Sequence, residues 1–101
     1  MRQADLGMYY VYVLQSLKDN NLYIGKTDDL KARVRRHNVG FVPATKSRRP
    51  LTLVFYEAFK NKTDAGKEEI FYKSGFGREA LRSKLTITLR QDGGVDNRNS
   101  L

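Results

Sequence analysis

The chain has 101 residues, no cysteine and one histidine, and its formal net charge is +8. A chain of this length forms one small domain, and this composition excludes disulfides, thiolate metal sites and histidine-rich zinc sites. No apolar run is long enough to span a bilayer, and residues 1–7 lack the apolar core of a signal peptide. We therefore expect a soluble, cytoplasmic protein without membrane contact. The 19 Lys and Arg against 11 Asp and Glu favour nucleic acid as partner over a merely solvated basic surface.

Two strands and a turn are predicted first. Residues 8–14 are aromatic and β-branched, residues 16–21 have turn composition, and residues 22–26 form a second strand. A loop of six residues would place Tyr12 directly opposite Tyr23. This register predicts that both hydroxyl groups lie on one face of the hairpin.

A helix follows, capped by Thr27 or Asp28 and running to about residue 38, with Gly40 available to end it. Arg33 lies beside the inward stripe of this helix, one turn before its last member. The inward stripe comprises Leu30, Val34 and His37.

The rest of the chain adds one strand and two helices. Residues 40–50 form a basic loop, 51–56 a third strand, 57–62 a loop and 63–74 a helix, and a short helix follows Gly77. We expect a domain over residues 8–85 between a lead of residues 1–7 and a flexible tail of residues 86–101. The predicted fold class is α/β, of the α+β kind: a small three-stranded antiparallel sheet flanked by helices. Its order is strand–strand–helix–strand–helix–helix.

This ordered set resembles the GIY-YIG nuclease domain. The segments that carry the resemblance are Tyr10-Val11-Tyr12, Tyr23-Ile24-Gly25, Asp29-Leu30, Arg33, His37-Asn38 and Ala65…Glu69…Lys73. The resemblance covers roughly residues 8–85, almost all of the foldable chain, and is greatest to small stand-alone members that resemble the N-terminal nuclease domain of the excinuclease C subunit.

The match departs from the family pattern at two places. Tyr10 and Val11 stand where the family has glycine and isoleucine, although the tyrosine position is filled by Tyr12. Many members carry an asparagine late in the domain, and the best matching position here is Ser83. This chain therefore has no asparagine at that position to take the same role.

The predicted catalytic side chains are Tyr12, Tyr23, Arg33 and His37. The resemblance implies that one tyrosine acts as general base or hydroxide relay, with Tyr23 the first choice, while the other orients water or phosphate. An unperturbed phenol has a pKa near ~10, which a neighbouring arginine and a cation would lower. Arg33 offers a planar fork to a phosphate oxygen. His37 would take a proton from a tyrosine hydroxyl or hold that hydroxyl in place.

These residue types also have structural interpretations. Glu69 falls on the apolar stripe of its helix, and without the resemblance an ion pair with Lys73 explains it better. With the resemblance, Glu69 is the ligand of one Mg²⁺ or Mn²⁺, and Glu57 is the reserve carboxylate. Arg33 would otherwise pair in solvent with Asp29, and a single histidine on a helix edge is commonly a packing residue.

The basic residues predict a phosphate-binding surface that contributes affinity without sequence choice. Its expected members are Gly25, Lys26, Arg36, Lys46, Arg48 and Arg49. We expect a metal-dependent endonuclease that acts on DNA rather than RNA and selects structure rather than sequence, with a protein partner to supply specificity. The alternatives are a nucleic-acid-binding module that keeps the fold without turnover and, last, a basic protein–protein adaptor.

Overall fold

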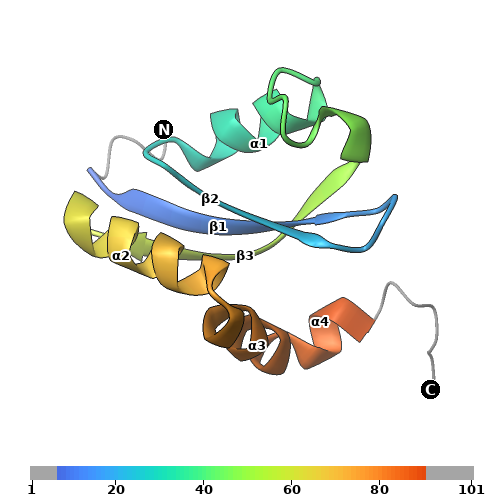
Figure 1. The fold of residues 1–101 in the computed structure, drawn as a ribbon. Coiled ribbons are helices and arrows are strands. Elements are labelled where there is room, and N and C mark those ends of the chain that lie inside the picture. Colours follow the sequence, from blue (N-terminus) through green and yellow to red (C-terminus); the bar gives the residue numbers. More distant parts are fainter. Residues whose placement is uncertain (1–6, 91–101) are drawn as a thin grey trace.

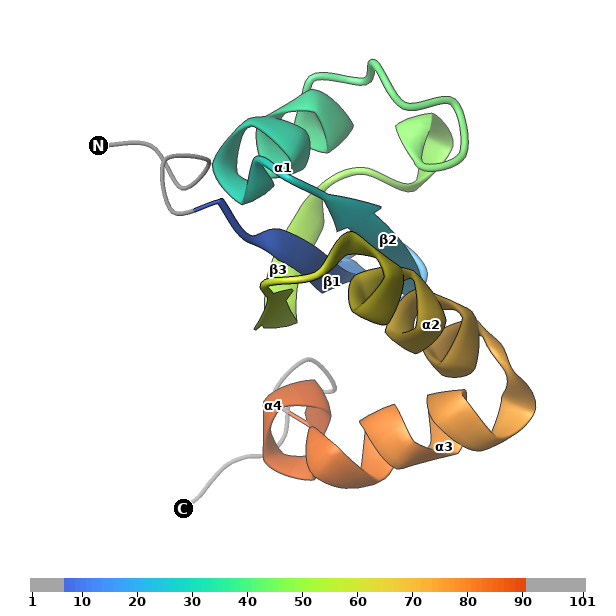
Figure 2. The same cartoon turned by 90° about the vertical axis from the view of Figure 1, so that its left-hand side faces the viewer.

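The computed structural model describes residues 7–90. A three-stranded antiparallel sheet in the order β2-β1-β3 lies between helix α1 on one face and helices α2 and α3 on the other, as Figures 1 and 2 show. The predicted fold class and element order are confirmed. The elements are β1 (Tyr9–Ser16), β2 (Leu22–Thr27), α1 (Leu30–Asn38), the short 3-10 helix η2 (Lys46–Arg48), β3 (Leu51–Phe59), α2 (Lys62–Lys73), α3 (Gly75–Lys84) and α4 (Thr86–Arg90).

The central strand β1 divides the core into two clusters because its side chains alternate between the faces of the sheet. Tyr10, Tyr12 and Leu14 pack with residues of α1 and β3. Val11 and Val13 pack on the opposite face against α2, α3 and β2. Tyr12, the one tyrosine of β1 among the predicted catalytic residues, thus lies between the sheet and α1. Within residues 7–90, no helix combines the length and apolar character that crossing a membrane requires.

The register of the hairpin differs from the predicted one. Tyr12 pairs with Gly25 rather than with Tyr23, a shift of two residues. The turn is tighter than expected because the backbone N–H of Ser16 donates to the carbonyl oxygen of Asn21 over 3.0 Å. Since side chains alternate with a period of two, this shift keeps both tyrosines on one face.

Helix α1 begins two residues later than a cap at Thr27 would give. Its N-cap is Asp29, whose Oδ1 accepts from the backbone N–H of Ala32 over 3.2 Å. The hydroxyl of Thr27 instead accepts from the N–H of Asp29 over 3.1 Å and so shapes the preceding turn. The helix ends at Asn38 as predicted, and Gly40 follows with a φ of 89°.

The later elements begin or end at other residues than predicted. Strand β3 continues to Phe59 because it stays paired with β1, so Glu57 lies in a strand rather than a loop. Helix α2 begins at Lys62, after Asn61, whose side chain caps it by accepting two backbone N–H groups. Helix α3 begins at Gly75 rather than after Gly77, since Ser74 caps it.

A fourth helix, α4, was not predicted. Residues 86–90 were assigned to the flexible tail, but they are helical, and Leu89 packs against the core cluster of β1 and α2. The rest of the expected tail, residues 91–101, and most of the expected lead, residues 1–6, lie outside the described residues.

Candidate active site

The phenol of Tyr12 is the centre of a buried polar cluster between β1 and α1. Its hydroxyl oxygen lies 2.9 Å from Nε2 of His37, and Nε of Arg33 donates to it over 3.4 Å. Tyr12 is 1% exposed and His37 is fully buried. Three of the four predicted catalytic side chains therefore meet at one oxygen atom.

Gly25 makes room for that phenol. A Cβ atom built on Gly25 would overlap the ring and hydroxyl of Tyr12, its directly paired neighbour across the sheet. Gly25 was predicted as a nucleic-acid contact that admits a close backbone. In the structure, the space over Gly25 is filled by the Tyr12 side chain instead.

Tyr23 lies beside this cluster. Its ring centre is 5.0 Å from that of His37 and 6.4 Å from that of Tyr12. Tyr23 is partly exposed, and its hydroxyl has no hydrogen-bond partner among residues 7–90. The Tyr12 hydroxyl is therefore fixed by hydrogen bonds within the protein, whereas the Tyr23 hydroxyl is open to a ligand or water.

Thr45 was missed at the sequence level. Its Oγ1 lies 2.7 Å from Nδ1 of His37, and the side chain is fully buried. A buried imidazole needs a partner for each nitrogen, so one such residue was to be expected. The sequence does not say which, because Thr45 sits in a loop of basic residues and carries no periodic signal.

The imidazole of His37 is neutral at physiological pH. Burial, together with the positive charge of Arg33, lowers the pKa of His37 to about 4. Burial also raises the pKa of the Tyr12 phenol, and the hydrogen bond and charge of Arg33 act against that rise. A neutral ring donates through one nitrogen and accepts through the other. The neutral ring therefore bonds to Tyr12 through one nitrogen and to Thr45 through the other, and this fixes the orientation of the phenol.

Glu69 approaches this cluster from α2. Its charge is the smallest of the causes that act on the pKa of Tyr12, and it raises that pKa. Its Oε2 is paired with Nζ of Lys73 over 3.1 Å, the ion pair expected from the structural interpretation. No group of three or more acidic, histidine or cysteine side chains within residues 7–90 is arranged to hold a metal. One carboxylate fits a cation such as Mg²⁺ that keeps most of its water ligands.

The reserve carboxylate Glu57 lies elsewhere. It sits on β3, at the opposite edge of the sheet from β2, and its Oε1 accepts from the hydroxyl of Tyr72 over 2.9 Å. Burial and the neighbouring Glu68 raise the pKa of Glu57. The structure does not bring Glu57 into the tyrosine cluster.

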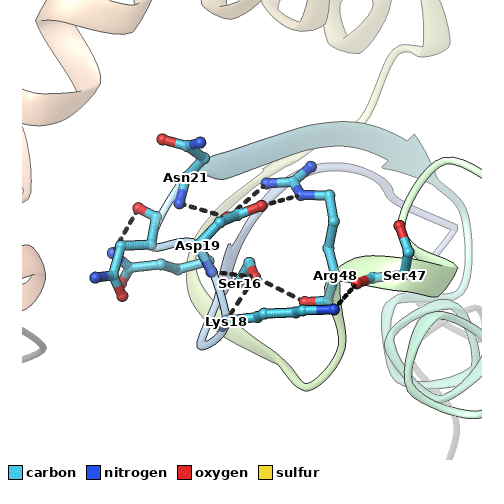
Figure 3. A network of polar contacts seen from close by, with 8 residues as sticks. Ser16, Lys18, Asp19, Asn21, Ser47 and Arg48 are labelled. Atoms are coloured by element: carbon cyan, nitrogen blue, oxygen red, sulfur yellow. Dashed lines mark hydrogen bonds and ion pairs between the residues drawn. The ribbon is translucent and has the colours of Figure 1, made fainter.

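A polar network fastens the basic loop to the β1–β2 turn (Figure 3). The Ser16 hydroxyl donates to the carbonyl of Arg48 over 2.7 Å and accepts from the N–H groups of Lys18 and Asp19 over 3.0 and 3.1 Å. The guanidinium of Arg48 pairs with Asp19 over 2.9 Å, and Lys18 Nζ donates to the Ser47 carbonyl over 3.0 Å. This loop carries Thr45, so the network also supports the partner of the histidine.

The predicted phosphate contacts fall into two groups. Arg48 is engaged with Asp19, so its charge is partly committed within the protein. Lys46 and Arg49 lie exposed on the same loop, and Arg36 is exposed on α1. Lys26 extends toward Gly66 of α2, on the opposite face of the sheet from Tyr12.

Comparison with known proteins identifies the class to which this fold and site belong. Residues 8–82 match the family model described as the GIY-YIG catalytic domain, and the chain belongs to this family.

Several relatives are small proteins of similar length. The chain is 40% identical over 78 residues to the UPF0213 protein SH2523 of Staphylococcus haemolyticus, with 76% of this chain and 94% of that protein covered. It is 46% identical over 86 residues to a UPF0213 protein of Pediococcus pentosaceus, with 84% of each covered. It is also similar to the solution structure of the UPF0213 protein BH0048 of Bacillus halodurans, at a TM-score of 0.50 and 35% identity, with 76% of this chain and 84% of that chain covered. The predicted resemblance to small stand-alone members is confirmed.

Proposed function

We propose that this protein is a metal-dependent endonuclease that hydrolyses phosphodiester bonds in DNA and selects its substrate by structure. The observation that carries the proposal is the meeting of Tyr12, Tyr23, Arg33 and His37 at one place in a GIY-YIG catalytic domain. The formal net charge of +8 supports a polyanionic substrate.

The side chains divide the work as follows. Arg33 donates one N–H to Tyr12, and the rest of its guanidinium fork is suited to a non-bridging phosphate oxygen. The open hydroxyl of Tyr23 loses its proton to solvent, and the resulting phenolate oxygen takes a proton from the attacking water. The Tyr12–His37–Thr45 chain fixes the orientation of the Tyr12 phenol.

Glu69 is the residue that would hold a divalent cation, Mg²⁺ or Mn²⁺. Such an ion, when bound, polarises the phosphate and stabilises the leaving oxygen. The Lys73 side chain is half-exposed, and surface ion pairs contribute only about 0–1 kcal/mol, so a cation can compete with Lys73 for the carboxylate.

A nicking assay on supercoiled DNA with Mg²⁺ or Mn²⁺ tests the proposal. The wild-type chain is expected to nick, and Glu69→Gln to slow nicking at least about a hundredfold, in the range of a lost charge-stabilising group. Glu79→Gln, an exposed carboxylate on α3, is the matched control and should retain the wild-type rate. A wild-type chain that cleaves no DNA or RNA of any structure, or a Glu69→Gln chain that cleaves like wild type, contradicts the proposal.

A non-catalytic binding module is the second candidate, and two observations favour it. Glu69 already has a partner in Lys73, and Ser83 is exposed on α3 where many members carry an asparagine. Binding without any metal effect on affinity or cleavage supports this candidate.

We also propose that the protein prefers DNA to RNA and that a partner protein supplies its specificity. A cytoplasmic location and a role in DNA repair are proposed with them.

A further inference from the structure

An exposed aromatic ring follows α1. Phe41 comes directly after Gly40, whose φ is 89°, and 64% of its surface is exposed. The guanidinium carbon of Arg36 lies 5.5 Å from the centre of this ring. The backbone N–H of Phe41 also donates to the carbonyl of Arg36 over 3.0 Å. The ring is therefore exposed to solvent on a backbone that the end of the helix fixes.

Helical geometry places Arg36 on the active-site side of α1. Successive residues of a helix are about 100° apart around its axis. Asn38 points toward β3, where its side-chain amide exchanges two hydrogen bonds with the backbone of Leu51. Arg33 and Arg36 therefore lie on the other side, toward β2, and Arg33 reaches the Tyr12 hydroxyl there. A strand bound by Arg33 that continues along the helix meets Arg36 and then Phe41.

A second guanidinium, that of Arg49, lies beside Gly40, the residue before Phe41. Nε of Arg49 donates to the carbonyl of Lys46 over 2.8 Å, and the rest of its guanidinium has no partner among residues 7–90. The guanidinium lies against Gly40, where a Cβ atom would be only 2.8 Å from one of its terminal nitrogens. Gly40 thus allows both the left-handed turn that exposes Phe41 and the close position of Arg49.

We propose that Phe41, with Arg36 and Arg49 beside it, stacks an unpaired base next to the phosphate held by Arg33. An exposed ring among guanidinium groups binds the face of any base and the phosphates that join it. Bases inside a duplex are already stacked and do not reach such a ring. The substrate therefore carries a single-stranded segment beside the cleaved bond. This inference rests on the proposed function and narrows its substrate class.

Tryptophan fluorescence tests the contact without catalysis. The chain has no tryptophan, so Phe41→Trp introduces a single reporter. Phe76→Trp is the matched control, because Phe76 is 84% exposed and belongs to α3, which lies on the other side of the sheet from α1 (Figure 1). In metal-free buffer, a short oligothymidine strand is expected to quench Phe41→Trp strongly, while a blunt duplex of the same length leaves it little changed. Equal quenching of both variants, or none of Phe41→Trp, overturns the proposal.

Alanine variants measure the size of the effect. Phe41→Ala is expected to bind oligothymidine roughly fivefold to a hundredfold more weakly, as for other base–aromatic contacts, with its affinity for the blunt duplex unchanged. Phe76→Ala should bind both as wild type does. Equal losses for the two nucleic acids, or no loss, overturn the proposal. Since no metal and no cleavage enter this measurement, its failure is separate from a failure of the nicking assay.

Discussion

His37 shows how burial decides the chemistry of a single side chain. It is enclosed by Tyr12, Tyr23, Arg33 and Thr45, and it has a hydrogen-bond partner on each ring nitrogen. Burial and the nearby guanidinium both disfavour the charged imidazolium. The ring is therefore suited to orient a phenol through a hydrogen bond, and not to act as a fixed positive charge toward phosphate.

The titration of His37 should consequently be displaced to low pH. The pKa falls from 6.5 to about 4, and His37 is the only histidine, so its ring resonances in an NMR pH series are unambiguous. We expect a midpoint near 4 in the wild-type chain. A midpoint between 6 and 7 would contradict the burial of the ring.

The same displacement makes stability depend on pH. Between about pH 4 and 6.5, His37 is protonated in the unfolded chain and neutral in the folded chain. The free energy of unfolding therefore rises with pH across this window. The contribution is complete above about 6.5 and is lost as the pH falls toward 4, in total roughly 3 kcal/mol. Urea denaturation at pH 7 and at pH 4.5 measures it, and His37→Gln should flatten the dependence.

Position 25 needs a glycine because the Tyr12 ring leaves no room for a side chain there, and not because of an unusual backbone conformation. We expect Gly25→Ala to lower the free energy of unfolding by about 1–3 kcal/mol, as for other overpacked interiors, or to displace the phenol from His37. Gly75→Ala is the matched control: a Cβ there meets nothing within 4 Å, so its stability should stay near wild type. Thermal or urea unfolding of the two variants decides the comparison, and equal costs would contradict this role for Gly25.

At the scale of elements, the β1–β2 turn and the basic loop behave as one unit because Ser16 binds both. Its hydroxyl makes three hydrogen bonds and is fully buried. Ser16→Ala leaves one carbonyl and two N–H groups without this partner, and we expect a loss of about 1–3 kcal/mol in the free energy of unfolding. Ser47→Ala, exposed on the same loop, should cost little. Amide exchange along residues 16–19 and 45–49 should accelerate together in Ser16→Ala alone.

The elements also show where sequence reasoning is sufficient and where it is not. Periodicity and β-branched composition were enough to predict the three strands and helices α1 to α3, and the resemblance to the GIY-YIG nuclease domain implied that Tyr12, Tyr23, Arg33 and His37 form one site. They did not predict the hairpin register or the start of α1, because hydroxyl and carboxylate side chains that compete for the same backbone N–H groups decide both. Thr45 was missed for a related reason, since its contact with His37 joins a helix to an irregular loop.

At the scale of the whole molecule, the Tyr12 cluster lies in the layer between α1 and the sheet, whereas Glu69, the proposed metal ligand, belongs to α2 on the other face (Figures 1 and 2). Within the sheet, Gly25 of β2 leaves the space that the Tyr12 phenol fills. A site shared between two layers depends on the whole sheet being formed. Activity and folding should therefore be lost together in urea, and activity that persists after the tyrosine signals of the folded state are gone would contradict this dependence.

We expect DNA binding to depend on particular arginine–phosphate contacts as well as on the net charge of the chain. Arg49→Ala and Arg48→Ala each remove one positive charge from a chain of net charge +8, so they are matched in their effect on the overall field. Arg48 is paired with Asp19, whereas the terminal nitrogens of Arg49 have no partner within residues 7–90. We expect Arg49→Ala to reduce the salt dependence of DNA binding by roughly one phosphate contact, or about 0.7–0.9 in the slope of log K against log salt. Arg48→Ala should reduce it less. Equal slopes for the two variants would mean that net charge alone governs binding and that the loop makes no defined phosphate contact.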